Sequence, residues 1–183
     1  MLVNSLNELS EETRKRIAIE TRQESVLDAL SDDTDESVLM EIALNQKTSA
    51  ETLAKLACKG GTSVRYCVAR NHNTNEDTLK HLADDEDFLV RSAVAENPKV
   101  SEIILDKLAS DPDFDVRCEV AKNFKTSEEI LAKLACDDEY IVRYCVAGNP
   151  NTSEATLKKL SGDDNISVRC ESMENPNYKI TSG

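Results

Sequence analysis

Six cysteines are the residues of this 183-residue chain that could most readily support metal or redox chemistry. Structural zinc sites use closely spaced pairs, and the chain has neither a Cys-x-x-Cys nor a Cys-x-x-His pair. Cys58 and Cys136 occupy equivalent positions of a repeat described below, as do Cys67 and Cys145, so each pair is expected to lie far apart. Cys118 and Cys145 could approach, but two thiolates do not make a structural metal site. We therefore predict that the cysteines are small buried hydrophobic residues, with no metal bound.

Catalytic motifs are equally absent from the sequence. It contains no P-loop, GxGxxG, GxSxG or HExxH motif, and its five glycines leave little material for phosphate-binding loops. His72 is predicted to lie in a turn, and His81 replaces a lysine in a surface column. Neither histidine has a neighbour at catalytic spacing that the repeat would not also produce. The sequence therefore predicts a protein that is not an enzyme and that carries no cofactor.

A 26-residue period organises the chain. The pair Val-Arg recurs at this interval, together with columns of Ala, Asn and Leu, and each period contains two apolar patterns of helical spacing. Such short helices must bury their apolar stripes against neighbouring repeats. We therefore predict an all-α solenoid, or superhelix, of about seven two-helix repeats. Residues 1–183 are expected to form a single domain, with 1–12 as an N-terminal half-repeat cap and 170–183 as a degenerate or truncated C-terminal repeat.

The residues between the two helices suggest where each one ends. Asn-Pro pairs are expected to end the first helix of a repeat, because a residue before proline avoids the helical region. A threonine then stands where the second helix should begin. Thr48 with Glu51, and Thr126 with Glu129, match the capping box of a helix N-terminus.

Two segments, VRYCVARNHNTNEDTLKHLADD and VRYCVAGNPNTSEATLKKLSGD, resemble the leucine-rich repeat variant family, and the resemblance covers roughly residues 13–178. The D-x-x-x-x-V-R spacing also resembles HEAT-type repeats, a broader α-solenoid class. The resemblance implies a right-handed superhelix in which the second helix of each repeat is 3₁₀ in part. The founding type of the family binds a [4Fe–4S] centre through an N-terminal cysteine cluster. This chain has no cysteine before Cys58, so no iron–sulfur cluster is implied.

A column of arginines allows two interpretations. Each guanidinium could bond an aspartate of the preceding linker or a carbonyl at a helix end, which would make an internal ladder. Alternatively, the row could face an anionic ligand; we favour the ladder. The segment Lys59-Gly60-Gly61 before Arg65 lacks an acid, so Arg65 is expected to be free or to pair elsewhere. The column consists of Arg65, Arg91, Arg117, Arg143 and Arg169.

Other columns supply candidate partner-binding residues beside Arg65. Lys107 and Lys133 belong to a cationic column on the second helix, whose alternative interpretation is a solvated face. Tyr66 and Tyr144 occupy variable positions on the first helix, where repeat proteins place recognition; alternatively, they fill a groove between repeats. A further column, predicted to pack between repeats, consists of Phe88, Phe114, Tyr140 and Ile166.

The net charge of −13 is concentrated in the linkers between repeats. The remaining residues are nearly balanced, so we predict an acidic ridge along one edge of the solenoid as a candidate site for a basic partner. Its candidate residues are Asp84, Asp85, Glu86, Asp87, Asp137, Asp138 and Glu139.

The predicted function is a non-enzymatic scaffold for protein–protein interaction. Strong acidity argues against nucleic acid, whose binding depends on cations. A nucleic-acid-binding HEAT-like protein and an acidic DNA mimic are the alternatives. No apolar run is long enough to span a membrane, and the start lacks the features of a signal peptide. These features favour a cytoplasmic location.

Overall fold

The computed structural model describes residue 6 and residues 8–179, and all regular secondary structure in that part of the chain is α-helical. The chain divides into two units, unit 1 (Met1–Lys99) and unit 2 (Val100–Gly183). Unit 1 contains α2 (Glu11–Glu20), α3 (Glu24–Leu30), α4 (Glu36–Leu44), α5 (Ala50–Lys59), α6 (Thr62–Arg70), α7 (Glu76–Leu82) and α8 (Phe88–Glu96). Unit 2 contains α9 (Glu102–Leu108), α10 (Phe114–Lys122), α11 (Glu128–Leu134), α12 (Tyr140–Gly148), α13 (Glu154–Leu160) and α14 (Ile166–Glu174).

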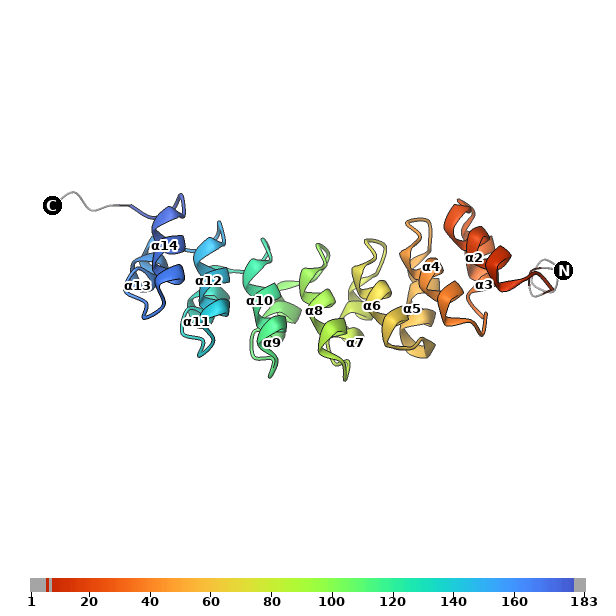
Figure 1. Ribbon diagram of the computed structural model, residues 1–183, viewed down its shortest axis with the longest axis horizontal. Coiled ribbons are helices and arrows are strands. Elements are labelled where there is room, and N and C mark those ends of the chain that lie inside the picture. Colours follow the sequence, from red (N-terminus) through yellow and green to blue (C-terminus); the bar gives the residue numbers. More distant parts are fainter. Residues whose placement is uncertain (1–5, 7, 180–183) are drawn as a thin grey trace. The chain divides into compact units, whose positions relative to one another are not determined.

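Within each unit the even-numbered helices pack side by side, and the odd-numbered helices form a second layer against them (Figure 1). α4 contacts α2 and α6 in unit 1, and α12 contacts α10 and α14 in unit 2. This arrangement is an all-α solenoid of two-helix repeats, as the 26-residue period predicts. None of the helices described is long and apolar enough to cross a membrane.

The core is built from the columns that define the period. In the repeat that contains α11 and α12, the odd-numbered helix buries Leu131 and Leu134, and the even-numbered helix buries Val142, Val146 and Ala147. The predicted core stripes are therefore confirmed. Small side chains on the even-numbered helices let neighbouring helices approach closely, as interiors at crystal-like packing density require.

A column of buried asparagines joins successive repeats. The side-chain amide of Asn149 donates hydrogen bonds to the carbonyl of Ala121 at 2.6 Å and to that of Asn123 at 3.1 Å, both in the preceding repeat. Its Oδ1 accepts the backbone N–H of Asn151 at 2.8 Å. One side chain thus ends α12, shapes the following turn and satisfies two carbonyls of its neighbour. Asn45, Asn71, Asn97 and Asn175 make the same pair of amide bonds.

The predicted capping boxes are wrong by one residue. Ser49, not Thr48, is the N-cap of α5, and it accepts the backbone N–H of Thr52 at 3.2 Å. The hydroxyl of Thr48 is fully buried and donates to the carbonyl of Ile42 at 2.5 Å. Thr126 likewise precedes its N-cap and donates to the carbonyl of Val120. These threonines therefore bond carbonyls at the C-terminal end of the even-numbered helix and do not cap the N-terminus of the odd-numbered helix.

The odd-numbered helices are α-helices, and i→i−3 hydrogen bonds tighten their ends, as where Asp84 N–H donates to the carbonyl of His81. The 3₁₀ character that the family resemblance implies is limited to such bonds. α5 runs further than its counterparts and ends before Gly60. A Cβ at Gly60 would lie 2.8 Å from the carbonyl oxygen of Leu56, so only glycine fits there without a shift.

Half of the predicted N-terminal cap, residues 1–12, lies outside the described residues, and Glu11 and Glu12 form the first turn of α2. In the predicted degenerate C-terminal repeat, Ser172 takes the place of a core valine, and its buried hydroxyl donates to the carbonyl of Arg169 at 2.8 Å. The right-handed superhelix and the single domain over residues 1–183 stay predictions.

Candidate functional site

An arginine–aspartate ladder runs along the linkers that precede the even-numbered helices. Arg143 donates from Nε and Nη2 to the two carboxylate oxygens of Asp163, at 2.6 and 2.9 Å, and from Nη1 to the carbonyls of Asp137 and Asp138. The side chains of Arg143 and Asp163 are only 16% and 8% exposed. This geometry uses the whole guanidinium fork. The same pairing occurs in Arg14–Asp33, Arg65–Asp85 and Arg117–Asp137.

The ladder confirms the structural interpretation of the arginines but corrects its direction. The preceding linker supplies carbonyls, and the carboxylate belongs to the following linker. Of the two expectations for Arg65, that it is free or that it pairs elsewhere, the second is confirmed: its Nε lies 2.6 Å from Oδ2 of Asp85, and its Nη1 bonds the carbonyl of Gly60. The absence of an acidic residue before Arg65 does not weaken the ladder, because the preceding linker contributes only a backbone carbonyl, which Gly60 provides.

Lowering the pH will destabilise unit 2 through this ladder. The hydrogen bonds from Arg143 hold the pKa of Asp163 below its ordinary value of 3.8. A carboxyl whose pKa is depressed in the folded state adds stability above its unfolded pKa, and this is lost as the pH falls through the folded pKa. We expect the urea midpoint, followed by circular dichroism, to fall as the pH decreases below about 4. The Arg143→Met variant should show a shallower decrease, and equal slopes in the two proteins would contradict this assignment.

The candidate acidic ridge contains both partly buried and exposed carboxylates. Asp85 and Asp137 belong to the ladder, and Asp87 is the N-cap of α8, where it accepts the N–H of Leu89. Glu86 lies 3.7 Å from Arg65 with its side chain 89% exposed. The remaining candidate residues, Asp84, Asp138 and Glu139, are exposed. Sequence counting therefore overstates the charge that each linker offers to a partner.

The lysine column lies beside the linkers. Lys133 donates to Ser110 Oγ at 2.7 Å, and Lys55 donates to Asp32 at 2.7 Å. The bonds from Lys55 and Lys59 lower the pKa of Asp32 to about 2. Lys107 is exposed on α9. These contacts favour the interpretation of the column as a solvated face whose ammonium groups balance nearby linkers.

The tyrosine candidates line hollows between even-numbered helices. Tyr144 borders two hollows of unit 2, one with Lys122 and Pro150 of about 190 Å³ and one with Ile166 and Cys170 of about 280 Å³. Tyr66 lies beneath the guanidinium of Arg70, 5.7 Å from its ring centre. Each tyrosine lies two positions from buried valines on either side, and so on the side of its helix opposite the core, which we call the outer face.

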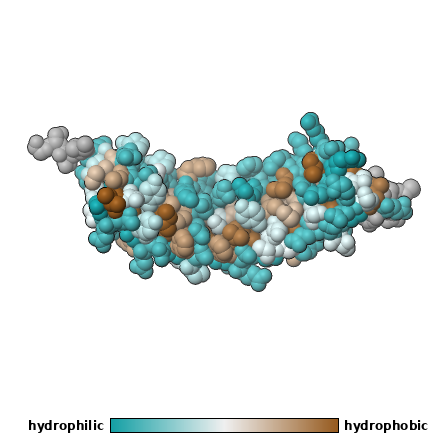
Figure 2. Space-filling view, in the orientation of Figure 1, coloured by the Kyte–Doolittle hydropathy of each residue, from teal (hydrophilic) through white to brown (hydrophobic). Residues whose placement is uncertain are grey.

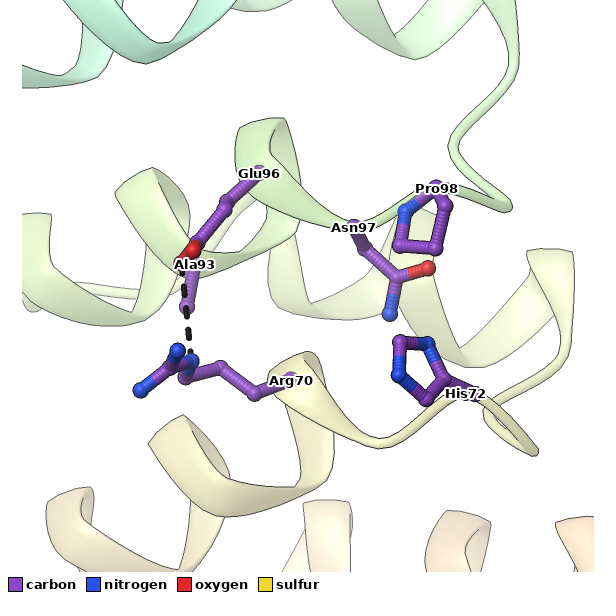
Figure 3. A pocket seen from close by; sticks show the side chains of 6 residues that line it. All are labelled: Arg70, His72, Ala93, Glu96, Asn97 and Pro98. Atoms are coloured by element: carbon purple, nitrogen blue, oxygen red, sulfur yellow. Dashed lines mark ion pairs between the residues drawn. The ribbon is translucent and has the colours of Figure 1, made fainter.

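Arg70 also lines a hollow of about 160 Å³ in unit 1 (Figure 3). Its side chain forms an ion pair with Glu96 across the hollow, at 3.5 Å, and the ring of His72 lies opposite Pro98. Both members of the ion pair are about half exposed, so it contributes little to stability. His72 lies in the turn after α6, as predicted.

Tyr144 should titrate at higher pH than an ordinary tyrosine. Its hydroxyl bonds the carboxylate of Glu171, and this contact raises the pKa of Tyr144 above 10.0. Replacing Glu171 with Gln should return that pKa toward its ordinary value, which ultraviolet absorbance titration measures. A Tyr144→Phe variant identifies the transition by difference. An unchanged titration in Glu171→Gln would show that the pair does not form in solution.

The thiols of Cys118 on α10 and Cys145 on α12 contact each other, and both residues are buried. This contact and burial raise the pKa of the Cys118 thiol, so it stays protonated. Cys67 is also buried, whereas Cys58, Cys136 and Cys170 are exposed. The prediction of burial is therefore wrong for the last three. Among the described residues, no group of three or more His, Cys, Asp or Glu side chains could hold a metal ion.

A column of apolar residues that the sequence predicts to pack between repeats is partly exposed. We define the apolar row as Phe114, Tyr140 and Ile166, the first residues of α10, α12 and α14, whose exposed fractions are 41%, 48% and 66%. The prediction that this column packs between repeats therefore holds only in part: Ile166 is mostly exposed, whereas Phe114 and Tyr140, like Phe88 in unit 1 at 37%, are more than half covered. Each residue lies two positions before a buried valine, or about 200° away around the helix. Helical periodicity could therefore have identified the row.

Hydrophobic residues form small separate groups on the visible face, surrounded by hydrophilic ones (Figure 2). Single exposed apolar residues are common on soluble proteins, but an equivalent residue repeated on three successive packed helices is a patterned surface.

The fold and this surface define the chain as an α-solenoid of short two-helix repeats. It is similar to the solved structure of a leucine-rich repeat variant with a novel repetitive structural motif, at 22% identity and a TM-score of 0.45, over 94% of this chain and 79% of that chain. It is also similar to a designed armadillo repeat protein in complex with the peptide (KR)4, at 17% identity and a TM-score of 0.40, over 94% and 95% of the two chains. No family model and no curated protein matches the chain.

Proposed function

We propose that this protein is a non-enzymatic scaffold that binds another protein through the outer face of its even-numbered helices. The observation that carries the proposal is the exposed apolar row on α10, α12 and α14. Aromatic and large aliphatic side chains in a row are typical of the centre of a protein interface, where their burial supplies most of the binding energy.

The polar columns have structural roles that support a non-enzymatic function. The Arg143 fork is satisfied by Asp163 and two carbonyls, and Asn149 is satisfied by two carbonyls of its neighbour. Thr126 closes α10 through its hydroxyl. Side chains with these partners stabilise the packing of successive repeats. The variable positions between them are then the ones available to bind a partner protein.

Site-specific photo-crosslinking in cells of the native host tests the proposal. A photoreactive phenylalanine analogue at position 140 is expected to form discrete adducts with a partner protein. The matched control carries the analogue at Ile103, which is 79% exposed on α9 of the same unit. Adducts that are identical at both positions, or absent from both, would contradict the proposal.

Nucleic acid is the alternative partner, and the contacts of the lysines do not favour it. Lys55 and Lys133 are held by Asp32 and Ser110, and exposed carboxylates lie in the adjacent linkers. Nucleic-acid binding would require cations that are free to neutralise phosphates and so release the counterions condensed on the nucleic acid. An acidic DNA mimic remains the other alternative. Competition with DNA for a DNA-binding enzyme would reveal it.

A further inference from the structure

We infer that the apolar row binds a basic segment in the polyproline II conformation, with an apolar side chain at every third residue. This inference rests on the proposed function and specifies its partner. Four features of unit 2 carry it: the spacing of the row, the polar linkers beside it, the negative charge on those linkers, and the contrast with the equivalent column of unit 1.

The spacing of the row follows from helix packing. α12 contacts both α10 and α14, and packed helices lie about 8–10 Å apart. Phe114, Tyr140 and Ile166 are each the first residue of their helix, so they keep one register across the three helices. A polyproline II segment has three residues per turn and a rise of about 3.1 Å, so every third side chain recurs on one face after about 9 Å. In a β-strand, by contrast, residues three apart point to opposite faces.

The linkers beside the row are polar, whereas the hollow that reaches the row itself is lined by Ile166 with Tyr144, Cys170 and Glu171. A hollow of about 340 Å³ is lined by Ser110, Asp111, Arg117 and Asp137, and one of about 590 Å³ by Asp138, Arg143, Lys159 and Asp164, among others. An α-helical partner with apolar residues at i and i+7 would also match the row, but its backbone groups are bonded within the helix and could not use the polar groups of these linkers. A polyproline II segment places no side chain on that face between its contacts, and its unpaired backbone groups can bond polar side chains.

The charge beside the row is negative. Asp138 and Glu139 precede Tyr140, Asp164 precedes Ile166, and all three carboxylates are exposed with no ion-pair partner among the described residues. Asp137 and Asp163 are already neutralised by Arg117 and Arg143. The nearby cations are Lys133 and Lys159, whose ammonium groups are held by Ser110 and Cys136. Lys or Arg residues between the apolar residues of the segment would therefore complement the surface and speed association.

The equivalent column of unit 1 differs from the row. Its members are Glu36, Thr62 and Phe88, so only one large apolar side chain is present there. The inferred site is therefore confined to unit 2, and the two units differ in what they can bind.

Fluorescence anisotropy with labelled synthetic peptides tests the inference on the full chain. The probe peptide repeats Lys-Pro-Leu, which favours polyproline II and places leucine at every third residue. Three comparison peptides keep its length: one with leucine at alternate positions, one helical with leucine at i and i+7, and one with Glu in place of Lys. We expect micromolar binding of the probe peptide and markedly weaker binding of the other three.

Protein variants locate the binding. Tyr140→Ala and Ile166→Ala should each weaken binding about fivefold or more, whereas Tyr140→Phe, which keeps the ring, should bind normally. The triple variant Asp138→Asn, Glu139→Gln, Asp164→Asn should bind more weakly and with less dependence on salt. Phe124→Ala and Ile103→Ala are matched controls, because both residues are exposed in unit 2 outside the row. Circular dichroism and the melting temperature establish that each variant folds.

Two results would overturn the inference: equal affinity for the alternate, helical or acidic peptide, or binding that Tyr140→Ala leaves unchanged. Failure of all four peptides, while position 140 still crosslinks to a partner protein, would reject the inferred segment and retain the proposed function. Failure of both measurements would reject both.

Discussion

Replacing Arg143 with methionine will lower the free energy of unfolding by about 3 kcal/mol, because it leaves the carboxylate of Asp163 partly buried without its cation. Arg143 makes two bonds to that carboxylate and two to carbonyls of the preceding linker. Methionine retains most of the apolar stem, so the loss reports mainly on the guanidinium. Urea unfolding at neutral pH measures the change.

Arg169 provides the matched control. Its Nη1 donates to the carbonyls of Asp163 and Asp164 at 2.7 and 3.0 Å, as Arg143 does one repeat earlier. No carboxylate partner of Arg169 lies among the described residues. Arg169→Met should therefore cost about 1 kcal/mol, the net value of its carbonyl bonds. Equal losses in the two variants would show that the carboxylate fork adds nothing.

Replacing Asn149 with alanine will destabilise the protein by about 3–5 kcal/mol, since three backbone groups lose their partner at once. The carbonyls of Ala121 and Asn123 and the N–H of Asn151 all depend on this one side chain, which is buried. Buried polar groups without partners cost more than the hydrogen bonds are worth. Chemical denaturation of the variant gives the value.

Asn151 is the comparison for this variant. Its amide also bonds two carbonyls of the preceding repeat, those of Phe124 and Thr126, but it lies in an exposed turn where water can replace it. Asn151→Ala should cost about 1 kcal/mol or less. A loss as large as that of Asn149→Ala would contradict the view that burial sets the cost.

The repeat architecture could be predicted from the sequence because the same physical constraint recurs in every period. Leu131, Leu134, Val142 and Val146 stand at helical spacing, and each equivalent position faces the core. The asparagine column and the end of each even-numbered helix were visible for the same reason. These core positions and helix ends are set within each repeat and between neighbouring repeats, so they could be predicted from the 26-residue period alone.

The partners of the polar columns could not be predicted in the same way. An acid lies both in the linker just before Arg143 and in the linker after it, and only packing decides which carboxylate the guanidinium reaches. Thr126 was misassigned because a hydroxyl can cap the next helix or bond the previous one, and local sequence permits both. The candidate site was only partly predicted: Tyr144 lies on the outer face, but the apolar row, which the sequence predicts to pack between repeats, is partly exposed.

The ladder also determines where this protein can be cut and rejoined. Each charge pair joins an arginine of one repeat to an aspartate of the next, as in Arg117–Asp137 and Arg143–Asp163. A junction between Asp137 and Arg143 separates no such pair, whereas a junction between Arg117 and Asp137 does. Leu39 and Lys59 replace the two members of one pair together, which leaves a natural discontinuity in unit 1. Shuffled or shortened arrays should therefore tolerate crossovers at the start of the even-numbered helices, and the exchangeable module is offset from the visible helix pair.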